Sequence, residues 1–294
     1  MPEFQGIFAP LTTPFEGDRI SSEKFGDNIR KYNATELTGY VILGSSGESV
    51  FLTDGESEEL VKTAKKTASP DKKLIAGTAR ESTQLTLEFT NRMAGCGMDA
   101  ALIRCPSYFK SKMDTQALRA HFLTIADRSE IPVIVYNIPR NTGVTMTVEF
   151  LAELAHHENI AGFKDSTGTL SALEELLPAL PAGFSYLLGA AGLLFPGIQL
   201  GASGGIVTVA DIAPEHCVKL YDLIQQEKWS EARRLQIDFI PLNKAVIQTY
   251  GVPAAKYALD LLGYYGGPCR LPLLPLDEKG KKEMEGILKE LELL

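Results

Sequence analysis

The sequence predicts an α/β fold, a (β/α)8 TIM barrel followed by a small C-terminal helical extension. Eight short apolar runs recur along about the first 210 residues, and most are followed by a turn and a segment of helical periodicity. The runs are apolar on both faces, as in parallel strands that are covered by helices. Eight repeats of this kind favour a closed barrel over an open doubly wound sheet, and the first strand–helix turns lack G-x-G-x-x-G.

The expected strands are five or six residues long. They are residues 6–10, 39–43, 73–78, 100–104, 132–137, 160–164, 185–189 and 204–209. The chain from Leu176 to Ala210 has no charged residue, but prolines and glycines interrupt it repeatedly. Buried strands joined by a short helix therefore explain it better than a membrane span.

The expected helices alternate with the strands and begin at recognisable signals. Residues 22–32 start with a serine cap, and Thr53 and Glu56 have the spacing of a capping box. The expected helices are 22–32, 53–67, 83–93, 114–127, 147–155 and 170–177, then 214–226, 230–250, 253–262 and 277–291. Because no strand separates the last four, we expect a barrel over residues 1–225 and a helical extension over residues 226–294.

Composition limits the function classes. Hydrophobic residues make up 45% of the 294-residue chain and charged residues 22%, so wholesale disorder is excluded. The net charge of −8 disfavours a nucleic-acid partner or an anionic membrane surface. The four cysteines form no C-x-x-C pair, and residues 1–6 have neither a basic nor an apolar leader region. We expect free thiols and a reducing, cytoplasmic location.

Lys164 is the first candidate functional residue. Active sites of such barrels lie at the carboxyl ends of the strands, and Lys164 closes the apolar run 160–164. Desolvating a lysine there is costly unless it pairs with an acid or reacts. Two interpretations follow: an ion pair with Asp165 or another acid, or a nucleophile that forms a Schiff base. The second role requires the neutral amine, which an apolar surrounding favours.

Neighbouring strand ends carry residues that Schiff-base chemistry on a keto acid needs. Tyr136 ends the adjacent strand, where a phenol can act as acid and base. Ser45 and Ser46 lie between two glycines, so hydroxyls and backbone N–H groups can face a carboxylate. The sequence has no H-E-x-x-H motif, no clustered Cys and His, and no phosphate-binding G-x-x-x-x-G-K-[ST] loop. We therefore expect no metal and no cofactor.

Three segments together resemble the dihydrodipicolinate synthase/N-acetylneuraminate lyase superfamily. They are residues 44–48 (GSSGE), 136–143 (YNIPRNTG) and 162–166 (GFKDS), and the resemblance extends over about residues 6–276. It implies a class I aldolase that handles pyruvate on a (β/α)8 barrel, commonly as a homotetramer. It implies that Lys164 forms the Schiff base and Tyr136 donates and accepts protons. Ser45 and Tyr108 complete a proton relay, with Tyr108 from the same chain or across a subunit interface.

The resemblance also implies which residues hold the small-molecule substrate. Ser46 binds the carboxylate of pyruvate, and Ile206 contacts it through its backbone. Ser166, Asn141 and Gly205, at or near other strand ends, are assigned to the substrate site as well.

Some positions separate branches of the superfamily. Synthases have an arginine just before Thr-Gly, where this chain has Asn141. In this chain the arginine lies one position earlier, at Arg140. The sequence leaves open whether the Arg140 side chain reaches the site. Residues 263–270 (GYYGGPCR) and 81–84 (ESTQ) resemble the 4-hydroxy-2-oxoglutarate aldolases. This branch implies cleavage of 4-hydroxy-2-oxoglutarate to pyruvate and glyoxylate. The alternatives are 4-hydroxy-tetrahydrodipicolinate (dihydrodipicolinate) synthase, which condenses pyruvate with aspartate semialdehyde, a related sugar-acid lyase, and a non-catalytic oxo-acid sensor.

Overall fold

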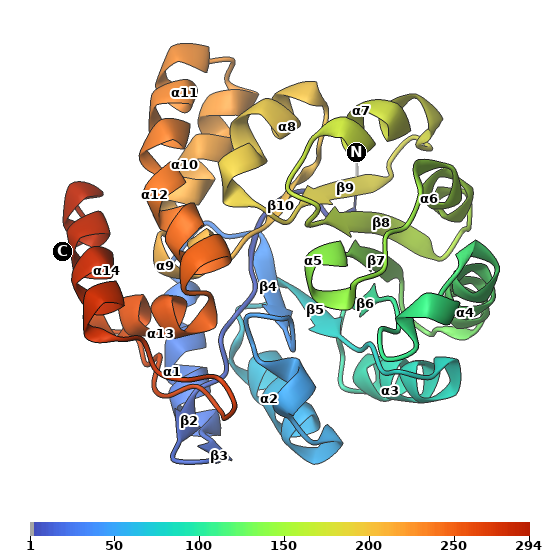
Figure 1. The fold of residues 1–294 in the computed structure, drawn as a ribbon, viewed down its shortest axis with the longest axis horizontal. Coiled ribbons are helices and arrows are strands. Elements are labelled where there is room, and N and C mark those ends of the chain that lie inside the picture. The colour runs from blue at the N-terminus through green and yellow to red at the C-terminus, as the bar shows by residue number, and fades with distance from the viewer. Residues whose placement is uncertain (1–2) are drawn as a thin grey trace.

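The computed structural model describes residues 3–294 and contains a closed barrel of eight parallel strands (Figure 1). The strands are β1 (Gly6–Ala9), β4 (Gly39–Ile42), β5 (Lys73–Gly77), β6 (Ala100–Arg104), β7 (Val133–Asn137), β8 (Ile160–Asp165), β9 (Ser185–Leu188) and β10 (Gly204–Ile206). They pair in sequence order, and β10 closes the ring by pairing with β1. The predicted fold is confirmed, and seven of the eight strands end within one residue of the expected bounds.

Helices surround the barrel and follow its strands (Figure 1). They are α1 (Ser22–Tyr32), α2 (Asp54–Thr67), α3 (Thr83–Gly95), α4 (Thr115–Arg128), α6 (Val148–Ala155), α7 (Ser171–Leu176), α8 (Leu194–Leu200) and α10 (Pro214–Gln225). The predicted capping box forms, because the Thr53 side chain accepts from the Glu56 N–H and Glu56 accepts from the Thr53 N–H. A serine, Ser21, occupies the cap position of α1, but its hydroxyl donates to Glu16 and makes no capping hydrogen bond.

Three local features differ from the sequence prediction. A two-stranded hairpin of β2 (Phe15–Glu16) and β3 (Arg19–Ile20) precedes α1 and is too short for periodicity to reveal. The last barrel strand ends at Ile206, because the chain turns there into α9 (Val209–Ile212). A four-residue helix, α5 (Pro139–Thr142), follows β7.

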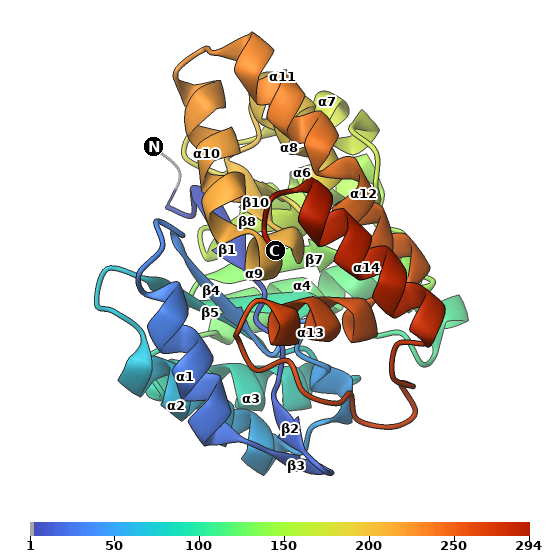
Figure 2. The ribbon, with the colours of Figure 1, turned by 90° about the vertical axis from the view of Figure 1, so that its left-hand side faces the viewer.

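The chain after α10 is helical, as expected, but less regular. The predicted helix 230–250 is divided into α11 (Trp229–Asp238), α12 (Ile240–Asn243) and a π-helix (Lys244–Thr249). Pro241 lies in the first turn of α12, where its missing N–H is tolerated, so α11 ends before it. Helices α13 (Val252–Leu261) and α14 (Glu278–Glu290) follow, and α14 packs against α12 and α13 (Figure 2).

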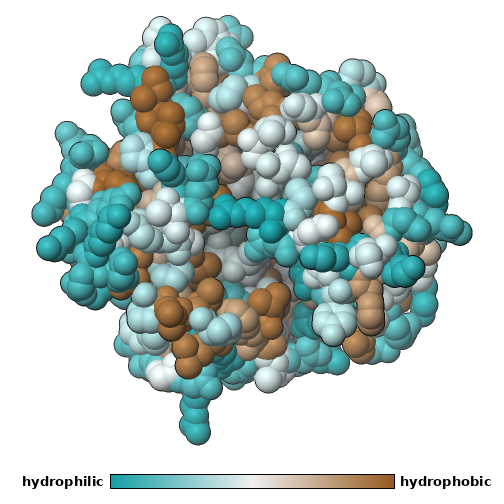
Figure 3. All heavy atoms as spheres, viewed as in Figure 1, coloured by the Kyte–Doolittle hydropathy of each residue, from teal (hydrophilic) through white to brown (hydrophobic). Residues whose placement is uncertain are grey.

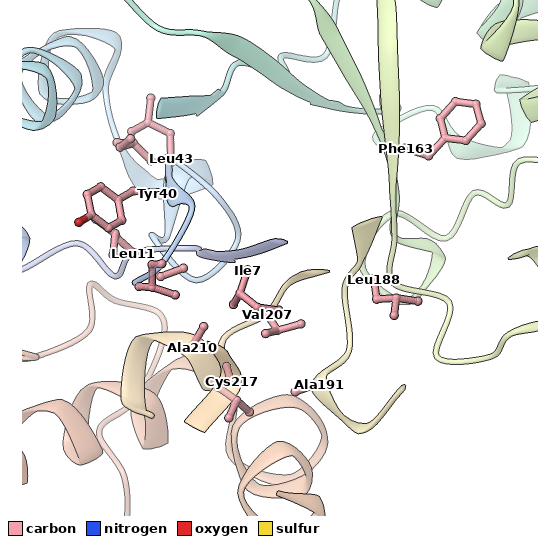
Figure 4. Close-up of a cluster of buried hydrophobic side chains, with 14 of the residues drawn as sticks. Ile7, Leu11, Tyr40, Leu43, Phe163, Leu188, Ala191, Val207, Ala210 and Cys217 are labelled. Carbon is pink, nitrogen blue, oxygen red and sulfur yellow. The ribbon is translucent and has the colours of Figure 1, made fainter. Parts of the chain in front are cut away.

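Apolar residues fill two layers. The outer layer lies between strands and helices; in Figure 4, Ile7, Val207 and Ala210 gather beside Cys217 of α10. The inner layer fills the barrel itself and reaches Tyr136 and Ile206 at the carboxyl ends of β7 and β10. This inner layer therefore forms the floor of the barrel mouth.

All four cysteines are free, as predicted. Across residues 3–294, helices that are both long and apolar enough to cross a bilayer are absent.

Asp211 of α9 is a buried acid that links folding to pH. Its exposed fraction is 0%, and within residues 3–294 neither carboxyl oxygen has a hydrogen-bond partner. Burial raises the pKa of Asp211 well above its usual value, an effect that the charge of Lys164 partly opposes. The folded protein therefore holds a proton that the unfolded chain releases above about pH 4.

Because the folded pKa is raised, stability falls as pH rises from about 4 to the folded pKa, by up to about 1.4 kcal/mol per pH unit. Asp211→Asn keeps the shape of the protonated acid and removes this dependence. We expect the variant to gain stability over the native protein at pH 8 relative to pH 5, measured by urea unfolding. Parallel pH profiles for the two proteins would show that Asp211 is ionised in the folded state.

Candidate active site

Lys164 and Tyr136 lie side by side at the carboxyl ends of β8 and β7. The two residues are direct partners in the strand register, as the predicted strand order requires. The Lys164 Nζ atom lies 4.3 Å from the centroid of the Tyr136 ring. Both residues are buried, with exposed fractions of 4% and 6%. An amine and a phenol are therefore held together at the mouth of the barrel.

The alternative interpretation of Lys164, an ion pair, is not supported. Within residues 3–294 no carboxylate lies within salt-bridge distance of its amine (the ion pairs formed there involve other lysines, arginines and one histidine). Asp165, the next residue along β8, instead accepts hydrogen bonds from Asn137 Nδ2 at 3.3 Å, Thr167 Oγ1 at 2.8 Å and Tyr186 Oη at 3.0 Å. Burial raises the pKa of Asp165, while these donors oppose the shift. Asp165 thus holds the strand ends together and leaves the amine of Lys164 unpaired.

A cavity of about 650 Å³ opens over Lys164. The face of the molecule seen in Figure 1 is hollowed near its centre (Figure 3). Seven residues predicted for the site line this cavity: Ser45, Ser46, Tyr136, Asn141, Lys164, Ser166 and Ile206. Residues of α12, the π-helix and the start of α13 line it as well, so the C-terminal extension contributes to the site.

Thr208 is a lining residue that the sequence reasoning missed. Its Oγ1 lies 3.0 Å from the Oγ of Ser46, so the loop after β4 and the turn after β10 meet there. Thr208 had been expected inside the last strand, where its role was hidden. The early end of β10 places its hydroxyl at the cavity.

Gly205 does not line the cavity. A Cβ atom at this position would lie 2.7 Å from Leu194 Cδ2, on the helix side of the barrel wall. Since side chains alternate along a strand, Ile206 faces the cavity and Gly205 faces α8. Glycine is needed there for close packing, and the assignment of Gly205 to substrate binding stays a prediction.

Tyr108 also lies outside the Lys164 cavity. It lines a neighbouring cavity of about 790 Å³, which shares Ser45, Tyr136, Arg140 and Asn141 with the first. Its side chain is 80% exposed, and its ring contacts that of Phe109 edge to face, with 5.0 Å between the ring centroids. The carboxylate of Glu81 holds this loop by accepting the backbone N–H of Tyr108 at 2.8 Å. In the single chain, Tyr108 is not brought to the amine.

A buried ion pair supports the Ser45–Ser46 loop. Glu48, just beyond it, has a left-handed backbone (φ +54°), and its Oε1 lies 2.6 Å from Nζ of Lys256 in α13. Its Oε2 accepts the Arg270 N–H at 2.8 Å, and Lys256 also donates to the Pro268 carbonyl at 2.7 Å. Both charged groups are almost fully buried, and burial lowers the pKa of Lys256, an effect that Glu48 opposes. The extension therefore fixes the loop that carries both serines.

Lys256→Met is expected to destabilise the protein by about 3–5 kcal/mol, because it leaves the Glu48 carboxylate buried without its partner. Urea unfolding at pH 7 measures the loss. The double variant Glu48→Gln/Lys256→Met removes both charges and should recover much of the stability. If the single and double variants lose equal stability, the pair is not coupled as the geometry indicates.

Helix α5 directs Arg140 and Asn141 to the site. Both residues line both cavities, so the arginine reaches the cavity over Lys164 despite lying one position earlier than in the synthase pattern. The Nη1 of Arg140 donates to the Ile247 carbonyl at 2.6 Å, and Nη2 donates to the Gln248 carbonyl at 3.4 Å. Arg140 thus connects the loop after β7 to the π-helix.

Comparison with known proteins gives matches along nearly the whole chain. The model of the dihydrodipicolinate synthetase family matches residues 3–291. A protein of Methanosarcina acetivorans named 4-hydroxy-tetrahydrodipicolinate synthase is 34% identical over 98% of both chains, and one of the same name from Ligilactobacillus salivarius is 33% identical over 96% of this chain and 97% of its own. The crystal structure of dihydrodipicolinate synthase from Aquifex aeolicus superposes with a TM-score of 0.93 at 31% identity, covering 99% of each chain.

These matches confirm the superfamily that the sequence motifs indicate. The relatives carry the name of the synthase, so the closer likeness to 4-hydroxy-2-oxoglutarate aldolases stays a prediction. The chain belongs to the dihydrodipicolinate synthetase family and is a lyase of the pyruvate-dependent class I aldolase type.

Proposed function

We propose that Lys164 forms a Schiff base with pyruvate and that the enzyme joins this pyruvate to an aldehyde, or releases the two by the reverse reaction. The observation that carries the proposal is the unpaired, buried amine of Lys164 at 4.3 Å from the Tyr136 ring. An amine that no carboxylate binds is available to attack a ketone. The adjacent phenol supplies the acid and base that the reaction needs.

The reaction proceeds through an enamine. The amine of Lys164 adds to the C2 ketone of pyruvate, and loss of water gives an iminium that acidifies C3. Tyr136, which has given its proton to the departing water, takes a C3 proton and so gives the enamine, whose C3 attacks the carbonyl carbon of the aldehyde and forms the C3–C4 bond. Tyr136 donates a proton to the new C4 alkoxide, and water then hydrolyses the iminium to release the product. In the cleavage direction, Tyr136 accepts the C4 hydroxyl proton as the bond breaks.

The remaining lining residues bind the substrate. Ser45 and Ser46 offer hydroxyls to the pyruvate carboxylate, and Ile206, which lines the same cavity, contacts it through its backbone. The contact between the hydroxyls of Ser46 and Thr208 limits the rotation of the serine hydroxyl. Ser166 and Asn141 add polar groups at the other strand ends.

The aldehyde is aspartate semialdehyde in our leading assignment, which makes the enzyme a 4-hydroxy-tetrahydrodipicolinate synthase. Relatives with that name, 30–34% identical across nearly the whole chain, support it. A second candidate is the cleavage of 4-hydroxy-2-oxoglutarate to pyruvate and glyoxylate. Asn141 favours this candidate, because the superfamily's synthases are expected to carry arginine at that position.

A side-by-side assay separates these candidates. In the condensation direction, the purified enzyme is given pyruvate with either aspartate semialdehyde or glyoxylate. In the cleavage direction, it is given either 4-hydroxy-2-oxoglutarate or a sugar acid, and the pyruvate released is detected by a coupled reaction. The synthase assignment predicts the highest kcat/KM for aspartate semialdehyde. A higher value for the glyoxylate reaction assigns the second candidate, and efficient cleavage of the sugar acid assigns a lyase. Pyruvate binding without turnover of any partner would indicate a sensor.

We further propose that Tyr108 acts across a subunit interface in a homo-oligomer, with a homotetramer as the expected state. Tyr108, Phe109 and Val50 form an exposed aromatic and apolar surface at the mouth of the barrel, with exposed fractions of 80%, 67% and 67%. Exposure of large apolar side chains side by side is typical of surfaces that contact another protein. Analytical ultracentrifugation of the native protein and of Tyr108→Glu measures whether this surface joins subunits.

A further inference from the structure

We propose that Asn243 determines which aldehyde the enzyme accepts, because its side-chain amide binds a hydrogen-bond donor on the carbon chain of the aldehyde. This donor is a hydroxyl or an ammonium group. The inference rests on the proposed function, since it assumes that Lys164 holds pyruvate in the same cavity. It goes further by assigning a recognition group to the C-terminal extension, outside the strand ends that carry the Schiff-base chemistry.

The amide of Asn243 lies at the cavity and is only partly used by the protein. Asn243 ends α12 and lines the 650 Å³ cavity together with Lys164 and Tyr136. It is buried, with an exposed fraction of 9%, and its Oδ1 has no hydrogen-bond partner within residues 3–294. A buried amide oxygen without a partner destabilises the free protein, and a donor group of a ligand removes that cost. The structure therefore leaves an acceptor for the substrate.

Gln236, a second buried amide of the extension, shows the contrast. It lies in α11 and, like α12, contacts the segment that follows β9. Its Oε1 accepts the Phe195 N–H at 2.8 Å, and its Nε2 donates to the Ala191 carbonyl at 3.0 Å. Gln236 does not line the cavity. An amide with a structural task in this region thus has both of its ends bonded, whereas the Oδ1 of Asn243 is left for a ligand.

Gly192 leaves space beside the Asn243 amide. It lies in the single 3₁₀ turn Ala191–Leu193, and it lines the cavity as Asn243 does. A Cβ atom at Gly192 would lie 3.2 Å from Asn243 Nδ2 and 3.8 Å from Asn243 Cγ, so a larger residue would press on the amide. Glycine at this position therefore gives the amide room to turn either of its hydrogen-bonding ends toward a ligand.

The rest of the lining makes this amide the acceptor for a donor group on the aldehyde. Asp and Glu are absent from the cavity lining formed by residues 3–294, so carboxylates there do not compete for the donor. The hydroxyls of Ser45 and Ser46 are assigned to the pyruvate carboxylate in the proposed function. An amide oxygen accepts from a hydroxyl or an ammonium group but not from a methyl group. Aspartate semialdehyde offers an ammonium group and a sugar-derived aldehyde offers a hydroxyl, whereas glyoxylate has neither.

The test compares aldehydes that differ only in the donor group. Aspartate semialdehyde and succinate semialdehyde differ by one ammonium group, and glycolaldehyde and propanal carry a hydroxyl and a methyl group at the same position. The kcat/KM for each aldehyde is measured with saturating pyruvate, and each pair gives one ratio. Comparing a ratio between the native enzyme and a variant cancels the intrinsic reactivity of the two aldehydes and any unfolded fraction of the variant.

Asn243→Leu keeps the approximate size of the side chain and removes both hydrogen-bonding ends. It should lower at least one of the two ratios by roughly 10–10²-fold, as expected for the loss of one buried hydrogen bond. A loss in the first pair identifies the ammonium group as the donor, and a loss in the second pair identifies the hydroxyl. Asn243→Asp keeps an acceptor oxygen and should keep most of the ratio. Gly192→Ala should lower the same ratio as Asn243→Leu, because its Cβ displaces the amide.

The control is Gln236→Leu, which removes the other buried amide of the extension. It should lose stability in urea unfolding, because the Phe195 N–H and the Ala191 carbonyl lose their partner. Both ratios should stay within threefold of the native values.

Failure of this inference and failure of the proposed function give different results. If borohydride and pyruvate do not label the native enzyme, the proposed Schiff-base function is wrong. If pyruvate labels normally but Asn243→Leu leaves both ratios unchanged, or Gln236→Leu lowers them equally, the assignment of Asn243 is wrong. Normal labelling without turnover of any of the four aldehydes also contradicts it, because the cavity then accepts neither of the chains that carry a donor.

Discussion

Lys164→Met is expected to lower turnover by at least roughly 10⁴-fold while leaving the protein folded. Methionine has no amine to form the iminium, so the C3 proton of pyruvate is no longer acidified. The fold should persist because the Lys164 amine has no ion-pair partner within residues 3–294 that its loss would leave unpaired, and methionine fills a buried site of similar shape. Steady-state kcat with the best substrate of the panel measures the loss.

The control for this variant is Lys73→Met. Lys73 begins β5 at the opposite end of the barrel, where it forms a long ion pair with Glu3 at 3.8 Å. It should keep kcat within threefold of the native value. If Lys164→Met retained more than a hundredth of native turnover, with the same circular dichroism spectrum, the amine would not be the nucleophile.

Tyr136→Phe is expected to lower kcat by roughly 10²–10⁴-fold with little effect on folding. The ring, which packs against the inner barrel layer and faces the Lys164 amine, is kept, whereas the hydroxyl that transfers the proton is lost. Borohydride trapping of pyruvate should still occur, since the amine is intact. The variant therefore separates Schiff-base formation from the carbon–carbon bond step.

Tyr186→Phe is the matched control. Tyr186 lies on β9, two strands from Tyr136, and its hydroxyl donates to Asp165 rather than lining the cavity. Its loss should cost about 1–3 kcal/mol of stability because it removes a donor from a buried carboxylate, but kcat should change little. Near-native kcat in Tyr136→Phe, or an equal loss in both variants, would refute the role of the phenol.

The fold was predictable because its signals are local. Apolar runs and capping residues such as Thr53 and Glu56 lie within a few residues of one another, and eight repeats leave few alternative topologies. The hairpin of β2 and β3 was not predicted, because its strands have two residues each and show no periodicity. The division of helix 230–250 follows from Pro241 and the π-helix, where packing against the barrel mouth outweighs helical periodicity.

The part of the site that the strand order determines was predictable from the sequence. Lys164 and Tyr136 were expected at adjacent strand ends, and the register pairs them directly. The contact of Ser46 with Thr208 and the ion pair of Glu48 with Lys256 join residues more than 160 positions apart. Such contacts depend on how loops and helices pack over the barrel, and local sequence patterns do not predict this packing.

Sequence position alone left open whether the side chain of Arg140 reaches the site. The short helix α5 brings Arg140 into the lining of the cavity together with Asn141. The direction of the Arg140 side chain depends on the carbonyls of the π-helix, a feature of the C-terminal extension rather than of the motif itself.

The most direct test is chemical trapping on the native enzyme. Pyruvate and borohydride are added, the protein is digested, and the modified residue is located by tandem mass spectrometry. The account predicts one reduced pyruvate per chain, attached to Lys164, with loss of activity in proportion to labelling. Full inactivation with the Lys164 peptide unmodified, or full activity after complete labelling, would contradict it.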